Sequence, residues 1–338
     1  MVIFKINILS FYTRFWYNPV MEKIAVLLNP SAGKGKSIKK KEKIERSLHS
    51  ARIPYDVFVS ESEAHLRRLA HRAINDYRGV VGVGGDTTFK IIAGEILKNR
   101  GRDESRRAPT LGMLGTGSAN DIARSLDTGN IEELCTAIRT GTYREMDVGC
   151  VKVNGRDEPV WFLGSLSAGL GTTVNRYIED FCRRHPGLAR FDLTGQALPG
   201  LLAVRRSFSR GFVPMEAVLE TGDKSRRIAF SLLVVANIPY YANGLRFHPD
   251  INPFDGRLEA VVIETRSFRQ TLRFAFRLSR QAHFQEEGFE VISAPGFRLT
   301  CPNSNMDIQL DGDIITGVES MDVSLLPGAL KVFTGRPS

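Results

Sequence analysis

The sequence predicts an α/β protein with two domains, and three observations support that fold class. The 338 residues leave room for two domains of ordinary size. Patterns typical of strands and helices alternate up to about residue 140, which favours a doubly wound parallel sheet. From Tyr143 onward the apolar runs are mostly strand-like. A second, β-rich domain is therefore expected, with a boundary near residues 145–149.

The first domain is predicted to contain four strands that alternate with helices. Residues 23–28 form the first strand, and a lysine-rich helix follows it. Residues 55–59, 80–83 and 111–114 form the others, and each precedes a stretch whose apolar residues recur at helical spacing. In a parallel sheet of this kind, the turns that follow the strands meet at one edge, where α/β proteins bind ligands.

Three of these four turns are rich in glycine or hydroxyl residues. The first, NPSAGKGKS at 29–37, has Pro30 where a Walker A motif requires glycine, so that motif is excluded. The others are GGDTT at 84–88 and GTGSAND at 115–121. Glycine lets the backbone approach a phosphate, and a helix N-terminus presents free N–H groups. Any one such turn is weak support, but three at one sheet edge predict a phosphate site.

Asp86 is the acidic residue of the central turn, around which the chain is organised. Its carboxylate can hold a metal ion or accept a proton. In an isolated GGD turn, Asp86 or a threonine would more often serve only as a helix N-cap. The two neighbouring turns favour the functional interpretation.

The second domain is predicted to be mostly strands, interrupted by helices near residues 173–184, 193–206 and 267–284. The stretch 266–284 is basic, with Phe268, Leu272, Ala275 and Phe276 at near-helical spacing. A membrane-surface helix is one interpretation, and a covering helix with a solvated cationic face is the more common one. The arginines around Phe208 fit either contact with anionic lipid or a helix end; they are Arg205, Arg206 and Arg210.

Composition is ordinary for a soluble globular protein, at 42% hydrophobic and 25% charged residues. The net charge of +9 suits an anionic partner, which could be a nucleotide, a nucleic acid or an acidic membrane surface. Four scattered cysteines without a CxxC pair are typical of reduced cytosolic thiols. No stretch reaches the roughly 18 to 20 apolar residues of a membrane span. A cytoplasmic protein that is peripherally associated with a membrane is expected.

Residues 1–20 are apolar and aromatic, but Lys5 and Arg14 interrupt them and no small-residue cleavage site follows. A signal peptide is therefore a poor match. Because Met21 precedes a clean strand pattern, an upstream mis-start is the favoured interpretation and an interfacial anchor the alternative. The expected division is an extension at 1–20, the α/β domain at 21–147, the β-rich domain at 148–325, and a segment at 326–338 that returns to the first domain.

The order of motifs resembles the diacylglycerol kinase catalytic-domain family, which includes sphingosine and ceramide kinases and soluble bacterial lipid kinases. The resemblance runs from about Lys23 to Phe333. It is carried by NPSAGKGKS, VGVGGDTT, GMLGTGSANDIAR, the Asp147-Val148-Gly149 segment with Trp161–Gly169, NIPYYANGLRFHPDINPFDGRL, Leu310-Asp311-Gly312-Asp313, and LPGALKVF. The resemblance implies a nucleotide cleft between an α/β domain and a sandwich-like domain that holds the lipid.

The resemblance also implies roles for particular residues. The residues that would contact ATP are Asn29, Gly33, Lys34, Gly35, Lys36, Ser60, Gly84, Gly85, Asp86, Thr87, Thr88, Phe89, Lys90, Ser118 and Asn120. Asp311 or Asp313 would accept the proton of the lipid hydroxyl, while Asp86 would order Mg²⁺ or its water, and these roles could be exchanged. Asp255, with the carbonyls of Asn252 and Arg257, is placed like the family's structural Mg²⁺ site. An ordinary turn at Asp255-Gly256 is an equally good interpretation of the residues alone.

Three departures from the family pattern separate two hypotheses. Thr87 stands where the family has glycine, Lys90-Ile91 replace Asn-Glu, and Asp313 replaces a longer glutamate. The first hypothesis is an ATP-dependent lipid kinase that acts on a diacylglycerol-like or sphingoid lipid at a membrane surface. The second is a nucleotide-binding or lipid-binding regulatory member with weak or no kinase activity. A nucleic-acid partner is not expected, because only the basic charge favours one, and an oligomer is possible.

Overall fold

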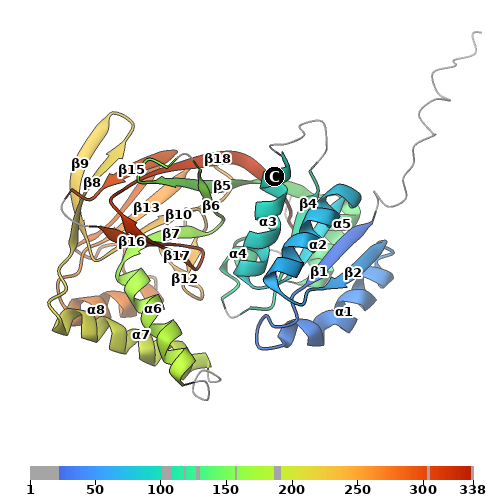
Figure 1. The fold of residues 1–338 in the computed structure, drawn as a ribbon, viewed down its shortest axis with the longest axis horizontal. Helices are drawn as coiled ribbons and strands as arrows, with labels where there is room; N and C mark the ends of the chain where they lie inside the picture. The colour runs from blue at the N-terminus through green and yellow to red at the C-terminus, as the bar shows by residue number, and fades with distance from the viewer. Residues whose placement is uncertain are drawn as a thin grey trace, which may run out of the picture.

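The computed structural model describes residues 23–100, 108–117, 119–126, 130–156, 158–185, 192–302 and 305–335 (Figure 1). The chain forms two lobes, and the N-terminal lobe contains a parallel sheet of strand order β2-β1-β3-β4. Its strands are β1 (Ile24–Leu28), β2 (Tyr55–Val59), β3 (Gly79–Gly84) and β4 (Thr110–Gly115). Every residue of β1 and β3 is buried, which explains their nearly continuous apolar sequences.

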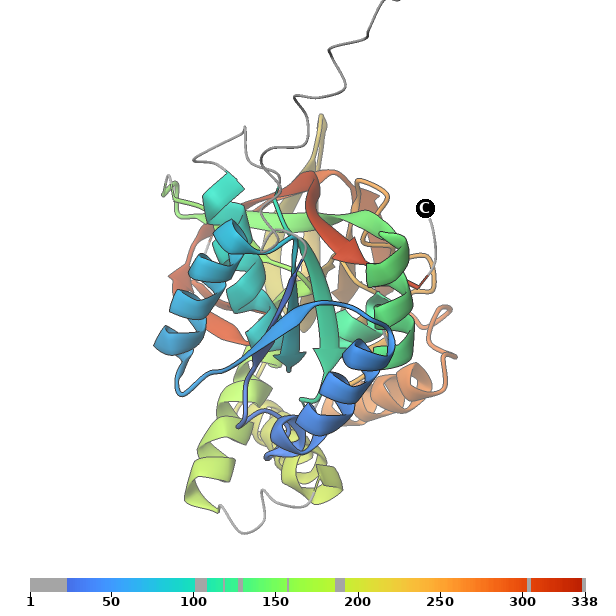
Figure 2. The same ribbon diagram turned by 90° about the vertical axis from the view of Figure 1, so that its right-hand side faces the viewer.

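Helices cover both faces of this sheet, as a doubly wound fold requires (Figure 2). One face packs against α2 (Glu63–Asp76), α3 (Asp86–Arg100) and α4 (Asp121–Ser125). The other packs against α1 (Lys36–Ser50) and α5 (Ile131–Thr140). The predicted parallel α/β domain is confirmed.

The C-terminal lobe is a sandwich of two sheets with an apolar core between them. One sheet is antiparallel and contains β14 (Phe289–Ala294), β13 (Leu258–Ile263), β10 (Leu232–Ala236), β7 (Ser165–Gly169), β16 (Met306–Leu310) and β17 (Asp313–Val318). The other layer contains β5 (Tyr143–Val153), β6 (Val160–Phe162), β18 (Ser320–Phe333), β15 (Gly296–Thr300), β8 (Met215–Thr221) and β9 (Lys224–Phe230). The predicted β-rich sandwich domain is confirmed.

Three helices and a small hairpin complete this lobe. The hairpin pairs β11 (Tyr240–Tyr241) with β12 (Leu245–Arg246). Two adjacent helices, α6 (Leu170–Arg184) and α7 (Asp192–Ser209), lie at one end of the sandwich (Figure 1). The third helix, α8 (Phe268–Ser279), packs on the outer face of β10 and β13. Within the described residues, no helix is both long enough and apolar enough to cross a bilayer.

Two long strands connect the lobes. β18 pairs antiparallel with β5 from Met321–Val153 to Phe333–Tyr143, and its residue Val332 also pairs in parallel with Leu111 of β4. The parallel sheet therefore continues into one layer of the sandwich, as the long strands at the top of Figure 1 show. The predicted domain limits stay a prediction, because the chain runs through this continuous sheet without a break that would fix them.

Some expectations for the second domain were wrong in detail. Among the strand-like apolar runs expected in this domain, the run at 228–236 is two strands in different sheets, because Ser231 turns the chain and its hydroxyl donates to the Ile263 carbonyl at 2.9 Å. The apolar run at 161–166 is likewise divided between β6 and β7. On α8 the buried residues are Phe274 and Leu278, not the predicted apolar set. Leu272 and Phe276 of that set are exposed.

Candidate active site

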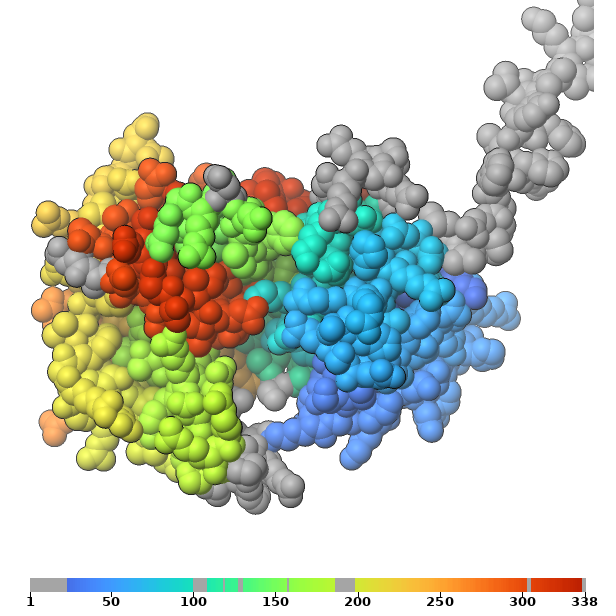
Figure 3. Space-filling model, viewed as in Figure 1, coloured from blue at the N-terminus to red at the C-terminus, as the bar shows by residue number. Residues whose placement is uncertain are grey.

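A cavity of about 550 Å³ lies between the two lobes. In Figure 3 the surface is hollowed between the blue N-terminal lobe and the light-green α6. From the N-terminal lobe the lining includes Asn29, Gly33, Gly85, Asp86, Thr87, Thr88, Gly117 and Asp121. From the C-terminal lobe it includes Gly164, Ser165, Ser167, Asn175, Tyr240, Tyr241, Gln309, Asp311 and Gly312. The cavity thus brings the three glycine-rich turns face to face with the β16–β17 turn.

The β1–α1 loop reaches the cavity by a close backbone approach. Gly33 has φ +60°, and a Cβ there would lie 1.7 Å from the Thr116 carbonyl oxygen, so only glycine fits. Gly35, with φ +85°, is the N-cap of α1, and Lys36 is the first residue of that helix. Asn29 donates to the Thr88 hydroxyl at 3.1 Å, which ties the loop to the central turn. The first two predicted phosphate turns therefore contact each other.

The central turn is equally compact. A Cβ on Gly84 would lie 2.2 Å from the Thr88 hydroxyl, and one on Gly117 would lie 2.6 Å from the Gly85 Cα. Thr87 is the second residue of α3, is exposed, and does not have a positive φ. The threonine is therefore accommodated without backbone strain at the position where the family has glycine.

Asp86 begins α3 and faces the cavity with a partly satisfied carboxylate. Its two oxygens accept from the backbone N–H groups of Asp121 and Ile122, at 3.2 and 3.1 Å. Burial raises the pKa of Asp86 to about 6; the N–H of Ile122 opposes the rise, and the neighbouring carboxylates of Asp121 and Asp311 add to it. The group therefore changes charge close to physiological pH, as groups at functional sites often do.

Asp121 is a lining residue that the sequence reasoning passed over, although it completes the quoted Asn-Asp motif. Its Oδ2 accepts from the Asn243 N–H at 3.0 Å, and its buried Oδ1 has no hydrogen-bond partner. Burial raises its pKa. The preceding residue, Asn120, has φ +56° and donates to the Gly117 carbonyl at 2.8 Å, so it shapes the third turn from outside the lining.

Asp311 faces Asp86 from the other lobe and is held by backbone donors. Its Oδ1 accepts from Gly164 and Ser165 at 2.9 and 3.0 Å, and its Oδ2 accepts from Leu163 at 2.7 Å. Burial raises the pKa of Asp311, while the Lys90 ammonium and then the three N–H groups lower it. These donors lie where the chain passes from β6 to β7, so the apolar run 161–166 is not one strand.

Asp313 is not part of the lining. Its side chain is 75% exposed and accepts from Lys90 Nζ at 2.7 Å. Lys90, on α3, also donates to the Leu310 carbonyl at 2.8 Å, so it connects the two lobes beside Asp311. Of the two candidate bases in the Asp-Gly-Asp segment, the structure brings only Asp311 to the cavity.

Several predicted ATP contacts lie away from the lining. Phe89 is fully buried in the core of the N-terminal lobe, so its side chain cannot meet a nucleotide. Ser60 is buried and its hydroxyl donates to the Leu28 carbonyl at 3.3 Å. Lys34, Gly35 and Lys36 belong to the first loop and the start of α1, and they do not line the cavity. Ser118 lies outside the described residues.

The predicted metal loop has oxygen donors but no side-chain cluster. No group of three or more His, Cys, Asp or Glu residues gathers around a metal position in the part of the chain that the structure describes. Asp255 accepts from the Arg257 N–H at 3.0 Å. Nearby, burial and the Asp255 charge raise the pKa of Glu259 to about 7, and its buried Oε2 has no partner. This unpaired oxygen and the oxygen-only donor set fit a hard cation such as Mg²⁺.

On the C-terminal side, polar groups that sequence reasoning missed lie opposite the turns. Asn175 of α6 and Gln309 of β16 are hydrogen-bonded to each other at 2.5 Å. Tyr241 donates to the Ser167 hydroxyl at 3.3 Å. Tyr240 and Tyr241 belong to the quoted segment NIPYYANGLRF, so the motif marked their region but not their position in the cavity.

Comparison with known proteins agrees with this geometry. Residues 23–151 match the family model of the diacylglycerol kinase catalytic domain, and residues 164–334 match that of the YegS C-terminal NAD kinase β-sandwich-like domain.

Two Bacillus subtilis (strain 168) proteins are similar over most of their length. The diacylglycerol kinase is 22% identical over 307 residues, which cover 87% of this chain and 90% of the relative. YtlR is 22% identical over 318 residues, which cover 91% and 98%. A crystal structure of a diacylglycerol kinase from Bacillus anthracis str. Sterne aligns with TM-score 0.64 at 16% identity, over 93% of this chain and 97% of that one, which shows the fold. With the two domain matches spanning nearly all the described residues, the chain belongs to the diacylglycerol kinase catalytic-domain family of lipid kinases.

Proposed function

We propose that the protein transfers the γ-phosphate of ATP to a hydroxyl group of a diacylglycerol-like or sphingoid lipid at a membrane surface. The observation that carries the proposal is the cavity in which glycine-rich turns of one lobe face Asp311 and several hydroxyl side chains of the other. Phosphoryl transfer needs aligned reactants and neutralised charge more than covalent chemistry, so such a cavity suits it.

The N-terminal lobe supplies the phosphate side of the proposed site. The α1 and α3 helices begin beside the cavity, at Lys36 and Asp86, and their first N–H groups favour an anion there. Backbone approach at Gly33 and Gly117 leaves no room for larger residues. Bound Mg²⁺ would neutralise developing phosphate charge, and Asp86 is the carboxylate placed to order it or its water.

The C-terminal lobe supplies the proposed base. Asp311 uses three of its roughly four acceptor positions on backbone N–H groups, which orients the carboxylate and leaves one position for the lipid hydroxyl. Its raised pKa makes it a better proton acceptor than an exposed aspartate, provided that it is ionised. The roles of Asp86 and Asp311 could still be exchanged.

The first test is transfer of labelled γ-phosphate from ATP with Mg²⁺ into a total lipid extract in mixed micelles. Wild type is compared with Asp86→Ala. A labelled lipid formed by the wild type alone supports the kinase, and the identity of that lipid gives the substrate class. No product despite measurable ATP binding would reject the kinase proposal.

A regulatory member with weak activity is the second candidate, and two observations favour it. The Asp311 carboxylate is engaged by three N–H groups, and Asp313, which replaces the family's glutamate, is bound to Lys90 outside the cavity. Thr87→Gly separates the candidates. Because Thr87 is an unstrained helical residue, we expect this change to lower activity or leave it unchanged, and a large gain would favour an impaired native loop.

A further inference from the structure

A second cavity, which the proposed reaction does not use, lies between α6 and α7. Its volume is about 550 Å³. The α6 wall is formed by two rows of residues spaced four apart, so one side of that helix faces the cavity. From α7 the wall includes Ala203, Arg206 and Ser207, followed by Arg210 just after the helix end. We call this cavity the α6–α7 groove.

The α6–α7 groove is strongly cationic. Four arginines line it, Arg176, Arg184, Arg206 and Arg210, against a single carboxylate, Asp180. Arg176 is neutralised by Asp307 at 2.7 Å, and Arg184 lies 3.9 Å from Asp180. Arg206 and Arg210 form no ion pair with any residue that the structure describes. Guanidinium groups on a concave surface suit a phosphate, because each can bind phosphate oxygens in bidentate fashion.

An apolar ridge continues from these arginines along α7. Leu198 and Leu202 precede Arg206 at intervals of four residues, so these three side chains follow one row on the helix surface, and Arg210 continues the spacing just after the helix end. Leu198 is 49% exposed, Leu201 42% and Leu202 37%. Single exposed leucines are common, but three on adjoining turns beside a cationic groove are not explained by packing against the residues that the structure describes.

We infer that the α6–α7 groove binds the phosphate headgroup of an acidic phospholipid while the leucine ridge enters the surface of the same bilayer. A dissolved anion would account for the arginines but not for the leucines. Apolar side chains together with arginines are the combination that holds a protein on an anionic membrane, and the net charge of +9 favours the same partner. This inference rests on the proposed function, because it names the surface from which the kinase would take its lipid.

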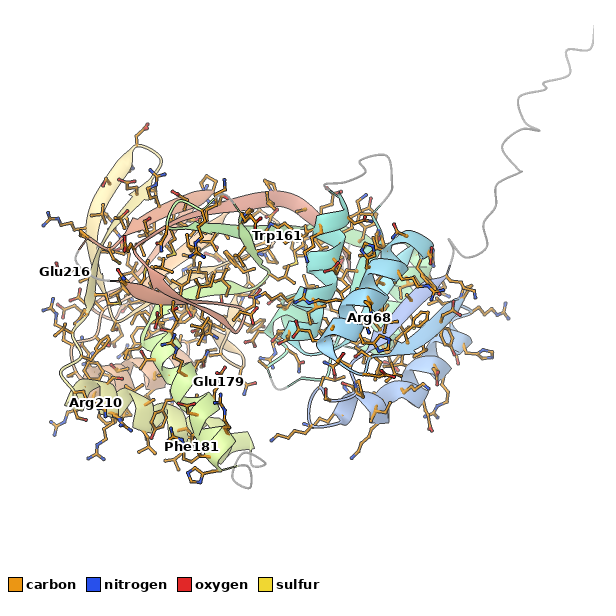
Figure 4. The ribbon with its side chains drawn as sticks, in the orientation of Figure 1. Arg68, Trp161, Glu179, Phe181, Arg210 and Glu216 are labelled. Atoms are coloured by element: carbon orange, nitrogen blue, oxygen red, sulfur yellow. The ribbon has the colours of Figure 1, made fainter. Side chains whose placement is uncertain are left out.

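The position of α6 connects the α6–α7 groove to the active-site cavity. Asn175 of α6 lines the cavity between the lobes, and its neighbour Arg176 lines the groove. A bilayer held at the groove would therefore lie one helix away from Asp311 and the proposed acceptor site. Figure 4 shows Phe181 and Arg210 together at this end of the C-terminal lobe and Arg68 on the other lobe.

The test is vesicle flotation without ATP, using phosphatidylcholine vesicles with and without phosphatidylglycerol. The groove variant is Arg206→Gln with Arg210→Gln, and the ridge variant is Leu201→Gln with Leu202→Gln. Arg68→Gln with Arg72→Gln is the matched control, because it removes two exposed arginines from α2. Each arginine near an anionic surface contributes about fivefold to partitioning, so the groove variant should lose on the order of 30-fold on anionic vesicles.

The outcomes of this test separate the inference from its alternatives and from the kinase proposal. We expect the control to stay within about twofold of wild type on anionic vesicles, and the ridge variant to bind both vesicle types less well. Equal losses for groove and control variants, or equal wild-type binding to both vesicle types, would overturn the inference. Saturable binding of inorganic phosphate that requires Arg206 and Arg210, together with vesicle binding that does not require them, would also overturn it in favour of a soluble anion. If groove-dependent vesicle binding is found but no lipid is phosphorylated by the wild type, docking stands and the kinase proposal falls.

A short-chain, water-soluble diacylglycerol controls for folding and for the active site. The groove variant should phosphorylate it at the wild-type rate and lose rate only on vesicles. A loss on both substrates would place the arginines in the reaction itself and contradict the docking role.

Discussion

At the scale of single residues, the site places carboxylates where burial raises the free energy of their charged forms. Asp86 is partly buried at the cavity, and this burial raises its pKa to about 6. Its hydrogen-bond donors, the N–H groups of Asp121 and Ile122, oppose that rise only in part. Such a group lowers the stability of the folded protein at neutral pH. This pattern is expected when a carboxylate must meet a cation or a proton.

Replacing Asp86 by asparagine should therefore stabilise the protein while removing activity. The folded pKa lies above the unfolded value of about 3.9, so the native state binds more protons and loses stability as pH rises from about 4 to 6. At neutral pH Asp86→Asn should raise the free energy of unfolding by up to about 3 kcal/mol, and near pH 4 the gain should vanish. Denaturant unfolding at both pH values measures this. A variant that is less stable at neutral pH would contradict the assignment.

The sequence identified the site's chemistry better than its contacts. Asp86 could be predicted because the glycines and the acid of the GGDTT turn restrict what that turn can do, whereas Thr88 and Asp311 followed from the family resemblance. The exposure of Asp313, the burial of Phe89 and the Asp121 oxygen without a hydrogen bond depend on packing between segments far apart in the chain, which no local pattern records.

At the scale of elements, the strand-to-helix turns depend on backbone contacts with one another. Gly33 touches the Thr116 carbonyl, and Gly85 lies against Gly117. The spacing of the apolar residues and the turn residues between the apolar runs were enough to predict the four parallel strands and their order along the chain. They could not reveal that Ser231 sends one apolar run into two sheets, since each half has the same β-forming composition.

Gly33→Ala should disrupt the first turn much more than Gly35→Ala does. A Cβ at Gly33 would lie 1.7 Å from the Thr116 oxygen, whereas one at Gly35 would have no atom within 4 Å. Both positions have positive φ, which costs alanine about 1 kcal/mol, so the difference between the variants isolates the clash. We expect Gly33→Ala to lower kcat/KM on the order of a hundredfold and Gly35→Ala on the order of tenfold or less. Equal losses would mean that backbone conformation, not the close approach, matters.

The loop that contains Asp255 should bind Mg²⁺, and this binding should stabilise the folded protein. Saturating Mg²⁺ should raise the midpoint of thermal unfolding by a few degrees in the wild type, because ligand binding to the native state alone stabilises it. Asp255→Asn should abolish the rise. Asp250→Asn is the matched control, since the Asp250 side chain is 86% exposed and lies in the same segment. A Mg²⁺ response that survives in Asp255→Asn would place the ion elsewhere.

At the scale of the whole molecule, the two lobes are held in register by a shared sheet and by a few polar contacts across the cavity. β5 and β18 run through both lobes, and Asp147 accepts from Gly256 at 2.7 Å and from Gly328 at 2.8 Å near the β18 bulge. Lys90 adds a contact between the lobes outside the cavity lining, since its ammonium binds the Leu310 carbonyl and Asp313 close to Asp311 in the chain. Lobe position and the ionisation of Asp311 are therefore coupled through one side chain.

Lys90→Met tests this coupling. Loss of the ammonium removes the charge that lowers the pKa of Asp311, so that pKa should rise and the acidic limb of the pH–rate profile should move to higher pH. Stability should change little beyond the loss of one partly exposed ion pair, which is worth about 1 kcal/mol at most. Lys98→Met on the same helix is the control, because among the described residues the ion pair of Lys98 is with nearby Glu95, at 3.0 Å. Asp313→Asn should leave the profile in place, since it keeps Lys90 charged. If Asp313→Asn abolishes transfer while Lys90→Met leaves the profile unshifted, the exposed Asp313 is the base, and the lobes must rearrange to bring it into the cavity.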